Sequence, residues 1–144
     1  MSPILEPTFC TATTGTARLD WNRDGREDVC IGHLDTPVAL LSNETATQGH
    51  WLSLTLVGVA TSRDAIGTVV RLNYGGRTSV RQLTAGDGFQ CSNERRLVFG
   101  LGSAEVVDEV QVKWPSGLEQ TFRDIPSDQK LILVEGNDRV LTQQ

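Results

Sequence analysis

Apolar side chains recur at every second position along most of the chain, and long helical patterns are missing. In residues 51–56 the leucines alternate with an aromatic residue and with hydroxyl residues. In residues 66–74 the face that runs from Ile66 to Tyr74 is mostly apolar, whereas Arg71 and Asn73 lie on the other face. Because successive side chains of a strand point to opposite faces, this period is typical of half-buried strands. The sequence therefore predicts an all-β fold, a small β-sandwich or barrel of about seven strands.

Turn residues separate the predicted strands at short intervals. Gly75-Gly76 divides two alternating runs, which is a hairpin signal because the tightest hairpin turns need positive φ. Pro115-Ser116-Gly117 and Pro126-Ser127-Asp128 are further turn sequences. The predicted strands of this region are residues 51–56, 66–74, 77–83, 110–114, 118–122 and 131–134, with a short last strand at Val140.

Two Gly-x-Gly sequences, at residues 86–88 and 100–102, do not predict a dinucleotide site. Neither has the third glycine of that motif, and neither opens a helical pattern. We interpret these glycines as turn residues, with Phe99 and Leu101 packing inward.

A domain boundary is predicted at residues 42–49, because this stretch is polar, small and non-periodic. Before it, three short strands are expected at residues 16–21, 28–32 and 37–41, which is too little to bury a core alone. Residues 1–43 must therefore pack on the domain at 50–136 or be the end of a larger array. Residues 137–144 are expected to form a C-terminal tail.

The charge balance disfavours a nucleic-acid partner. Lys plus Arg number 13 and Asp plus Glu 18, so the net charge is −5, and the arginines are scattered without a basic run. No apolar stretch approaches the roughly 20 residues that span a bilayer, so no membrane span is predicted. No apolar segment follows Met1 either, and any export signal of the parent protein is expected to lie outside this sequence.

The three cysteines, Cys10, Cys30 and Cys91, permit at most one disulfide within the chain. Cys30 and His33 are three residues apart, which in a strand places them on opposite faces. A single tetrahedral zinc ion is then difficult to hold, so we expect the thiols to be small buried apolar groups.

The sharpest local signal is a candidate calcium loop at residues 20–28. Oxygen-bearing side chains stand at loop positions one, three, five and nine, and Gly25 at position six allows a sharp reversal. Ca²⁺ takes about six to eight oxygen ligands, and alternate residues of a tightly curled loop can point inward together. The predicted ligands are the side chains of Asp20, Asn22, Asp24 and Asp28 and the main-chain carbonyl of Arg26.

This loop differs from an EF-hand. Position twelve holds Ile31 in place of the bidentate glutamate, and the residues on either side of the loop read as strands. The alternative interpretation is an Asp- and Asn-rich turn without metal, since these residues dominate turns in general. Three carboxylates so close together repel one another unless a cation or water separates them, which favours calcium. Such an ion would be structural, because no ligand position is left open for a substrate.

Catalytic interpretations find little support in the sequence. His33 and His50 have no neighbouring nucleophile that suggests a triad, and are expected at a surface or interface. Asp64 and Asp87 could form an acid–base pair, although nothing in the sequence brings them to the spacing of a glycosidase. We therefore expect a protein that is not an enzyme. A carbohydrate-binding module remains the alternative, with an exposed aromatic platform drawn from Trp51, Phe89 and Trp114.

From His50 to about residue 135 the chain resembles the ASPIC/UnbV domain, which is found at the C-terminal end of cartilage acidic proteins and of many bacterial exported proteins. The order and spacing of seven short motifs carry the resemblance. They are His50-Trp51-Leu52, Arg63-Asp64-Ala65-Ile66-Gly67, Gly75-Gly76-Arg77, Ala85-Gly86-Asp87-Gly88-Phe89, Phe99-Gly100-Leu101-Gly102, Val107-Asp108 and Val112-Lys113-Trp114-Pro115-Ser116-Gly117. The chain departs from the family pattern at Ser62, at Gln90-Cys91-Ser92 and at Val98.

Residues 19–32 resemble the end of an FG-GAP or VCBS repeat, a β-propeller blade with a calcium loop. This resemblance implies a larger parent protein with propeller blades upstream of Met1, and an extracellular or cell-surface location. It also implies a non-catalytic interaction module whose partner is an unknown protein or glycan. The family has no agreed enzymatic activity, so the resemblance carries no catalytic residue to this chain.

Overall fold

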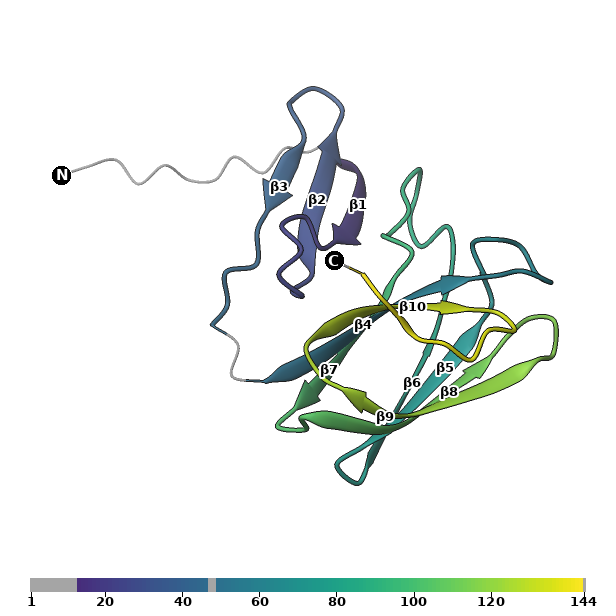
Figure 1. Cartoon of the computed structure of the whole chain (residues 1–144). Helices are drawn as coiled ribbons and strands as arrows, with labels where there is room; N and C mark the ends of the chain where they lie inside the picture. The colour runs from purple at the N-terminus through teal and green to yellow at the C-terminus, as the bar shows by residue number, and fades with distance from the viewer. Residues whose placement is uncertain (1–12, 47–48, 144) are drawn as a thin grey trace.

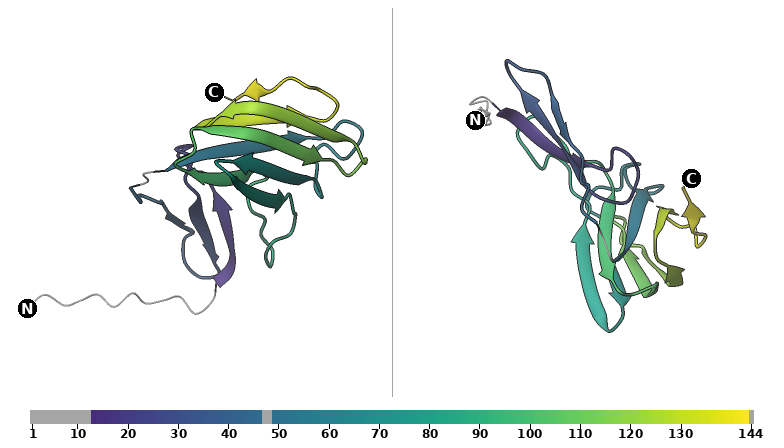
Figure 2. Two further views of the ribbon diagram at one scale, coloured as in Figure 1. Left: turned by 90° about the horizontal axis from the view of Figure 1, so that it is seen from below. Right: turned by 90° about the vertical axis from the view of Figure 1, so that its left-hand side faces the viewer.

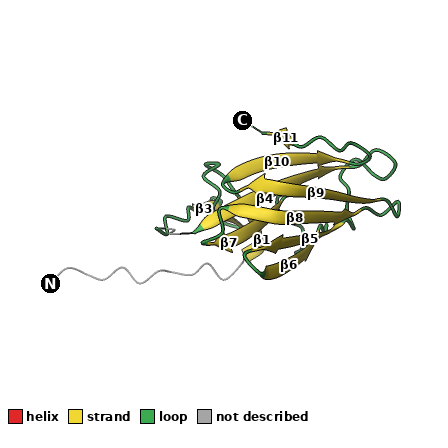
Figure 3. Ribbon diagram, turned by 60° about the horizontal axis from the view of Figure 1, so that its bottom comes forward, coloured by secondary structure: helices red, strands yellow, loops and turns green. Residues whose placement is uncertain are grey.

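The computed structural model describes residues 13–46 and 49–143, so Cys10 lies outside the described residues. The described residues form eleven strands in three sheets and contain no helix (Figure 1). The predicted all-β fold is confirmed. None of the three sheets closes into a barrel, and the larger part of the chain is a β-sandwich (Figure 3).

The first sheet is small and antiparallel, with strand order β1-β2-β3. Its strands are β1 (Thr13–Leu19), β2 (Asp28–His33) and β3 (Ala39–Leu41). Each overlaps a strand predicted from the sequence, and the candidate calcium loop is the β1–β2 connection. The sheet stands against one end of the sandwich, as Figure 2 shows from two directions.

Two four-stranded sheets make the sandwich, in the orders β11-β10-β4-β7 and β6-β5-β8-β9. The first sheet comprises β4 (His50–Val57), β7 (Leu97–Gly102), β10 (Gln129–Val134) and β11 (Leu141–Thr142). The second comprises β5 (Val69–Tyr74), β6 (Arg77–Gln82), β8 (Val106–Lys113) and β9 (Glu119–Pro126).

The inner faces of the two sheets supply one apolar core. The alternation predicted for residues 66–74 is confirmed from Thr68 onward, since Val70 and Leu72 are fully buried and Tyr74 nearly so. Ile66 departs from the prediction because it lies in the loop before β5 and is exposed. The largest side chains buried in this core are those of Trp114, Phe99, Leu52, Leu54, Leu72 and Leu133.

β7 corrects the prediction that residues 100–102 form a turn. Leu97, Phe99 and Leu101 are buried on one face of this strand, and Gly100 and Gly102 lie on the other. The inward packing of Phe99 and Leu101 is therefore confirmed, although the element is a strand. β7 also makes the sandwich eight strands in place of about seven, because Gly is a poor strand former and hides the alternation.

β4 and β10 pair in parallel, which joins segments far apart in the chain. Their register sets Gln129 opposite Leu52 and Val134 opposite Val57. The start of β10 consequently lies beside the start of β4, at the end of the sandwich that faces the small sheet. The first residues of β4 and β10 therefore lie close to the small sheet.

Candidate metal loop and adjoining groove

The predicted loop folds as a tight connection between the end of β1 and the start of β2. The Asp20 side chain is almost fully buried, and its Oδ2 accepts a hydrogen bond from the amide of Gly25 at 3.1 Å. Gly25 has a φ of 87°, a conformation that favours glycine. Asp20 Oδ1 is buried without a hydrogen-bond partner among the described residues. A buried, unsatisfied carboxylate oxygen is costly unless a cation or water meets it.

Asn22 and Asp24 shape the middle of the loop through local hydrogen bonds. Asn22 Oδ1 accepts from the Asp24 amide at 3.1 Å, and Asp24 Oδ1 accepts from the Arg26 amide at 2.9 Å. Asp24 also forms an ion pair with the Arg26 guanidinium. Partial burial would raise the pKa of Asp24, but the hydrogen bonds from Arg26 and Asn22 outweigh it and hold that pKa below its usual value.

Asp28 closes the loop against the main chain. It is fully buried, and its Oδ2 accepts from the Trp21 amide at 2.8 Å. Its Oδ1 accepts from the Asn43 amide at 2.7 Å, which ties the loop to the segment after β3. Asp28 therefore organises two turns at once, as Asp does when its side chain replaces a main-chain acceptor.

The loop has one unsatisfied oxygen that a cation could meet, Asp20 Oδ1, whereas the charge of Asp24 is already offset by the Arg26 guanidinium. Among the described residues no three His, Cys, Asp or Glu side chains gather closely enough to hold a metal ion on their own. Calcium would therefore depend on main-chain and amide oxygens as well, as calcium sites commonly do. The unsatisfied Asp20 Oδ1 is the observation that fits a cation, and calcium in this loop stays a prediction.

Lys130, at the start of β10, places its ammonium beside the same carboxylate. Nζ lies 3.3 Å from Asp20 Oδ2 and donates a hydrogen bond to the carbonyl of Arg23. Arg96 approaches from another side, with its guanidinium 3.9 Å from Asp20 Oδ2 and 3.0 Å from Glu94. Both cationic side chains are largely buried, at 13% and 9% exposed. The loop is thus held to the sandwich by buried charges.

Trp51 on β4 packs against the β1–β2 loop at Gly25. A Cβ added to Gly25 would lie 2.4 Å from the Trp51 indole, so the glycine packs directly against the ring. The indole therefore serves as a contact between the small sheet and the sandwich. This contact uses much of the face that a sugar-stacking platform would need.

The segment before β7 runs along β1. The amide of Glu94 donates to the Arg18 carbonyl at 2.9 Å, and Asn93 Oδ1 accepts from the Arg18 amide at 2.8 Å. Cys91, within the stretch that departs from the family pattern, donates its thiol to the Thr16 carbonyl at 3.3 Å. This departing stretch consequently takes part in the contact between the small sheet and the sandwich.

A family model described as ASPIC and UnbV matches residues 58–140, which is 83 of the 144 residues. The chain belongs to the ASPIC and UnbV family. The match begins directly after β4 and covers the rest of the sandwich up to the residue before β11. The small sheet and its loop lie outside the part that the ASPIC and UnbV model covers. No curated protein matches the chain.

Two further expectations concern membranes and thiols. The described part of this ASPIC and UnbV protein holds no helix of the length and apolarity needed to cross a membrane. Cys30 and Cys91 are free thiols and are half-buried, so they are less enclosed than predicted. His33 is the last residue of β2, three residues after Cys30. Its Nδ1 is buried without a hydrogen-bond partner in the described chain.

The candidate catalytic and stacking residues are dispersed. Asp64 forms an ion pair with Arg95, whereas Asp87 accepts hydrogen bonds from Thr84 and Asn93. Trp114 is 1% exposed, so it belongs to the core and cannot be a stacking platform. Phe89 is 77% exposed and remains available on the surface.

Sequence reasoning missed a buried carboxylate at Glu135, directly after β10. Its Oε2 accepts hydrogen bonds from the amides of Val59, Ala60 and Thr61 at 2.7, 2.8 and 2.9 Å. Its Oε1 accepts from the Ser116 hydroxyl. The Ser116 hydroxyl, with the main-chain amides, outweighs burial and lowers the pKa of Glu135 to about 2. No local pattern marks this residue, because its partners come from distant segments.

His50 and Asp128 form a second missed pair. His50 Nδ1 lies 2.6 Å from Asp128 Oδ2, and the Trp51 amide donates to Asp128 Oδ1 at 3.2 Å. The His50 hydrogen bond, against the effect of partial burial, lowers the pKa of Asp128. The expectation that His50 lies at a surface or interface is confirmed, since it is half-exposed where the two parts of the chain meet.

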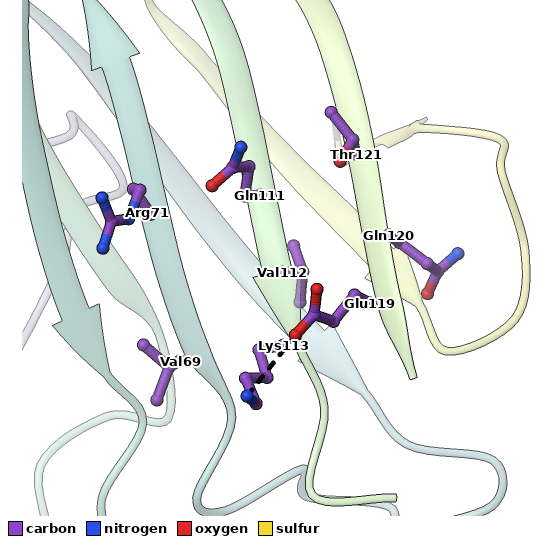
Figure 4. A pocket seen from close by; sticks show the side chains of 8 residues that line it. All are labelled: Val69, Arg71, Gln111, Val112, Lys113, Glu119, Gln120 and Thr121. Atoms are coloured by element: carbon purple, nitrogen blue, oxygen red, sulfur yellow. Dashed lines mark ion pairs between the residues drawn. The ribbon is translucent and has the colours of Figure 1, made fainter. Parts of the chain in front are cut away.

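Several hollows open on the described residues, and two of them lie on faces of the sandwich sheets. One, of about 290 Å³, lies on the outer face of β5, β8 and β9, where Arg71, Gln111 and Thr121 stand on neighbouring strands (Figure 4). Lys113 and Glu119 in this hollow pair with each other at 3.4 Å. The larger groove, of about 390 Å³, lies between the loop and the strands β4 and β7.

Proposed function

We propose that this chain is a non-catalytic interaction module at the end of a larger extracellular β-propeller protein, and that calcium stabilises it. Membership of the ASPIC and UnbV family supports an extracellular-type module. The resemblance of residues 19–32 to a propeller blade supports the rest of the proposal. Calcium would be held by Asp20, Asn22, Asp24 and Asp28 together with the Arg26 carbonyl.

The incomplete small sheet supports a neighbour upstream. Three strands bury little by themselves, and large apolar side chains on and beside this sheet are exposed. Exposed apolar residues gathered along β3 and the connection before it favour a covering partner. They are Leu34, Val38, Leu40 and Leu41, of which Leu34 is 69% exposed.

The observation that carries the calcium proposal is the buried, unsatisfied Asp20 Oδ1 in a loop with oxygen-bearing side chains at alternate positions. An ion there would meet the free oxygen and offset the negative charge of the loop. The ion would also fix the β1–β2 connection on which Trp51 and Lys130 pack. Its role is then to hold the small sheet in place against the sandwich.

Thermal melting with and without calcium tests the proposal. A site with the dissociation constant typical of extracellular modules, roughly 0.1–1 mM, would add about 1.4–2.7 kcal/mol at roughly 10 mM calcium. For a chain of this size the melting temperature should rise by several degrees. Magnesium at equal concentration is the control for ionic strength. An unchanged melting temperature in calcium would refute the metal part of the proposal.

A further inference from the structure

Glu94, in the segment between β6 and β7, reaches the metal loop (residues 20–28) from outside it. Its Oε2 accepts a hydrogen bond from the main-chain amide of Asp20 at 3.0 Å. Asp20 is the first of the predicted calcium ligands, so this bond holds the main chain at the point where the loop begins. A carboxylate that accepts from an amide makes a charge-assisted hydrogen bond, which is stronger than one between neutral groups.

The main chain around Glu94 is itself fixed on β1. The Glu94 amide donates to the Arg18 carbonyl at 2.9 Å, and Asn93 Oδ1 accepts from the Arg18 amide at 2.8 Å. The Glu94 carbonyl accepts from the Arg96 amide at 2.8 Å. The carboxylate of Glu94 therefore reaches Asp20 from a segment that is already held against the small sheet, and this hold does not require a metal ion.

The other oxygen of Glu94 offsets the charge of Arg96. Arg96 Nη2 lies 3.0 Å from Glu94 Oε1, whereas Arg96 Nη1 lies 3.9 Å from Asp20 Oδ2. The Arg96 side chain is 9% exposed, so water and salt screen its charge poorly. Without Glu94, a largely buried positive charge would face the carboxylate that is expected to bind calcium. Because like charges repel, that charge would weaken the binding of a cation there.

Lys130, the second cationic neighbour of Asp20, has no such partner. Its ammonium lies 3.3 Å from Asp20 Oδ2, and among the described residues no other carboxylate forms an ion pair with it. Of the two cations beside the loop, Arg96 alone thus has an acidic side chain of its own to balance it. A change at Glu94 consequently alters the charge near Asp20 through Arg96 and leaves the contact of Lys130 in place.

We propose that Glu94 is a positioning residue of the metal loop, which holds the Asp20 main chain and balances Arg96 so that the Asp20 carboxylate can bind calcium. The inference rests on the calcium site proposed above and names a residue outside the loop that sets its affinity. Groups that hold a metal ligand in place commonly tune the affinity for the metal. Glu94 lies within the ASPIC and UnbV match at residues 58–140, whereas the loop lies outside it. The two parts of the chain would therefore build the site together.

Isothermal titration of calcium into the wild type, Glu94→Gln, Arg96→Gln and the double variant tests the inference. Glu94→Gln should weaken calcium binding at least about threefold, a modest factor because Glu94 is 36% exposed. Arg96→Gln should tighten binding by a similar factor. The double variant should return to within about twofold of the wild type, because the two opposite charges are removed together. If the two side chains acted by packing alone, both single changes would weaken binding and the losses would add.

Amide hydrogen exchange in chelator gives a second measurement that needs no metal. Glu94→Ala, which removes the acceptor altogether, should speed exchange of the Asp20 amide at least about tenfold, because that amide loses its hydrogen bond. Glu119→Gln is the matched control for both measurements. It removes the same charge from an exposed ion pair with Lys113, so its calcium affinity and its exchange at Asp20 should equal those of the wild type.

Failure of this inference is distinguishable from failure of the metal proposal. Equal calcium affinity in the wild type and Glu94→Gln would overturn the inference and leave the metal proposal standing. A double variant that binds no more tightly than Glu94→Gln would also overturn it, because the charge of Arg96 would then play no part. If the wild type binds no calcium, the metal proposal fails, and unchanged exchange of the Asp20 amide in Glu94→Ala would show that Glu94 does not hold the loop either.

Discussion

Lys130 and Asp20 show how a single contact joins two parts of the chain. The ammonium lies against a carboxylate that is 2% exposed and also reaches a loop carbonyl. The ammonium is the nearer of two cationic groups that offset the charge of this carboxylate, the other being the Arg96 guanidinium. This contact explains how the loop keeps its shape before any metal binds.

Replacing Lys130 by Met should destabilise the metal-free chain by about 1–3 kcal/mol, because a buried carboxylate loses the nearer of its two cationic partners. The same change should tighten calcium binding, since the ion no longer competes with an ammonium for Asp20. Urea unfolding in chelator and calcium titration measure the two effects. Lys113→Met, whose ion pair with Glu119 is exposed, is the control and should cost under about 1 kcal/mol. Equal stability of the two variants would contradict the role given to Lys130.

Glu135 makes the stability of the fold sensitive to acid. Its pKa is lowered from 4.5 to about 2 in the folded chain, so the folded state binds the proton less readily than the unfolded state. Its stabilising contribution is complete above the unfolded pKa and is lost as the pH falls toward 2. Glu135→Gln should therefore lower the melting temperature most at neutral pH.

Melting curves of the wild type and Glu135→Gln from pH 7 to pH 2 check this expectation. The difference between the two melting temperatures should shrink steadily below about pH 4.5. Glu119→Gln, at an exposed site, should follow the wild type throughout. A difference that stays constant across this range would show that Glu135 stabilises the fold by packing alone.

At the scale of the elements, the strands that alternate clearly were predictable from the sequence and β7 was not. Its buried residues, Leu97, Phe99 and Leu101, do alternate, but Gly100 and Gly102 flank Leu101 and indicate a turn. The turn propensity of these glycines is overridden because the segment pairs with β4. The sequence of the segment alone does not reveal this pairing. The parallel pairing of β4 with β10 is likewise a long-range property, since the two strands lie far apart in the chain.

The contact between the β1–β2 loop and β4 can be tested at Gly25. Gly25→Ala should destabilise the chain by about 2–4 kcal/mol, because the φ of 87° is strained for alanine and the new Cβ meets the Trp51 ring. Gly76→Ala is the matched control, since its φ is 71° and nothing lies within 4 Å of the added Cβ. The control should cost only about 1–2 kcal/mol. Urea unfolding followed by tryptophan fluorescence distinguishes them, and equal losses would show that the Trp51 contact contributes nothing.

At the scale of the whole molecule, the sequence indicated a metal loop and a sandwich but not how they meet. The loop residues were predictable because their spacing is local, and the flanking strands follow from alternation. Lys130, Arg96 and Trp51 could not be placed, because each reaches the loop from a strand or segment distant in sequence. The result is a small sheet that stands against one end of the sandwich (Figure 2). Buried charges, an indole and a hydrogen-bonded segment along β1 attach it there.

Calcium bound by residues 20–28 would be part of this attachment. Isothermal titration of calcium into the wild type, Asp24→Ala and Asp35→Ala tests it most directly, since Asp35 is an exposed aspartate outside the loop. We expect one ion per chain for the wild type and for Asp35→Ala, and an affinity at least about tenfold weaker for Asp24→Ala. No calcium binding by the wild type, or equal binding by Asp24→Ala, would contradict it.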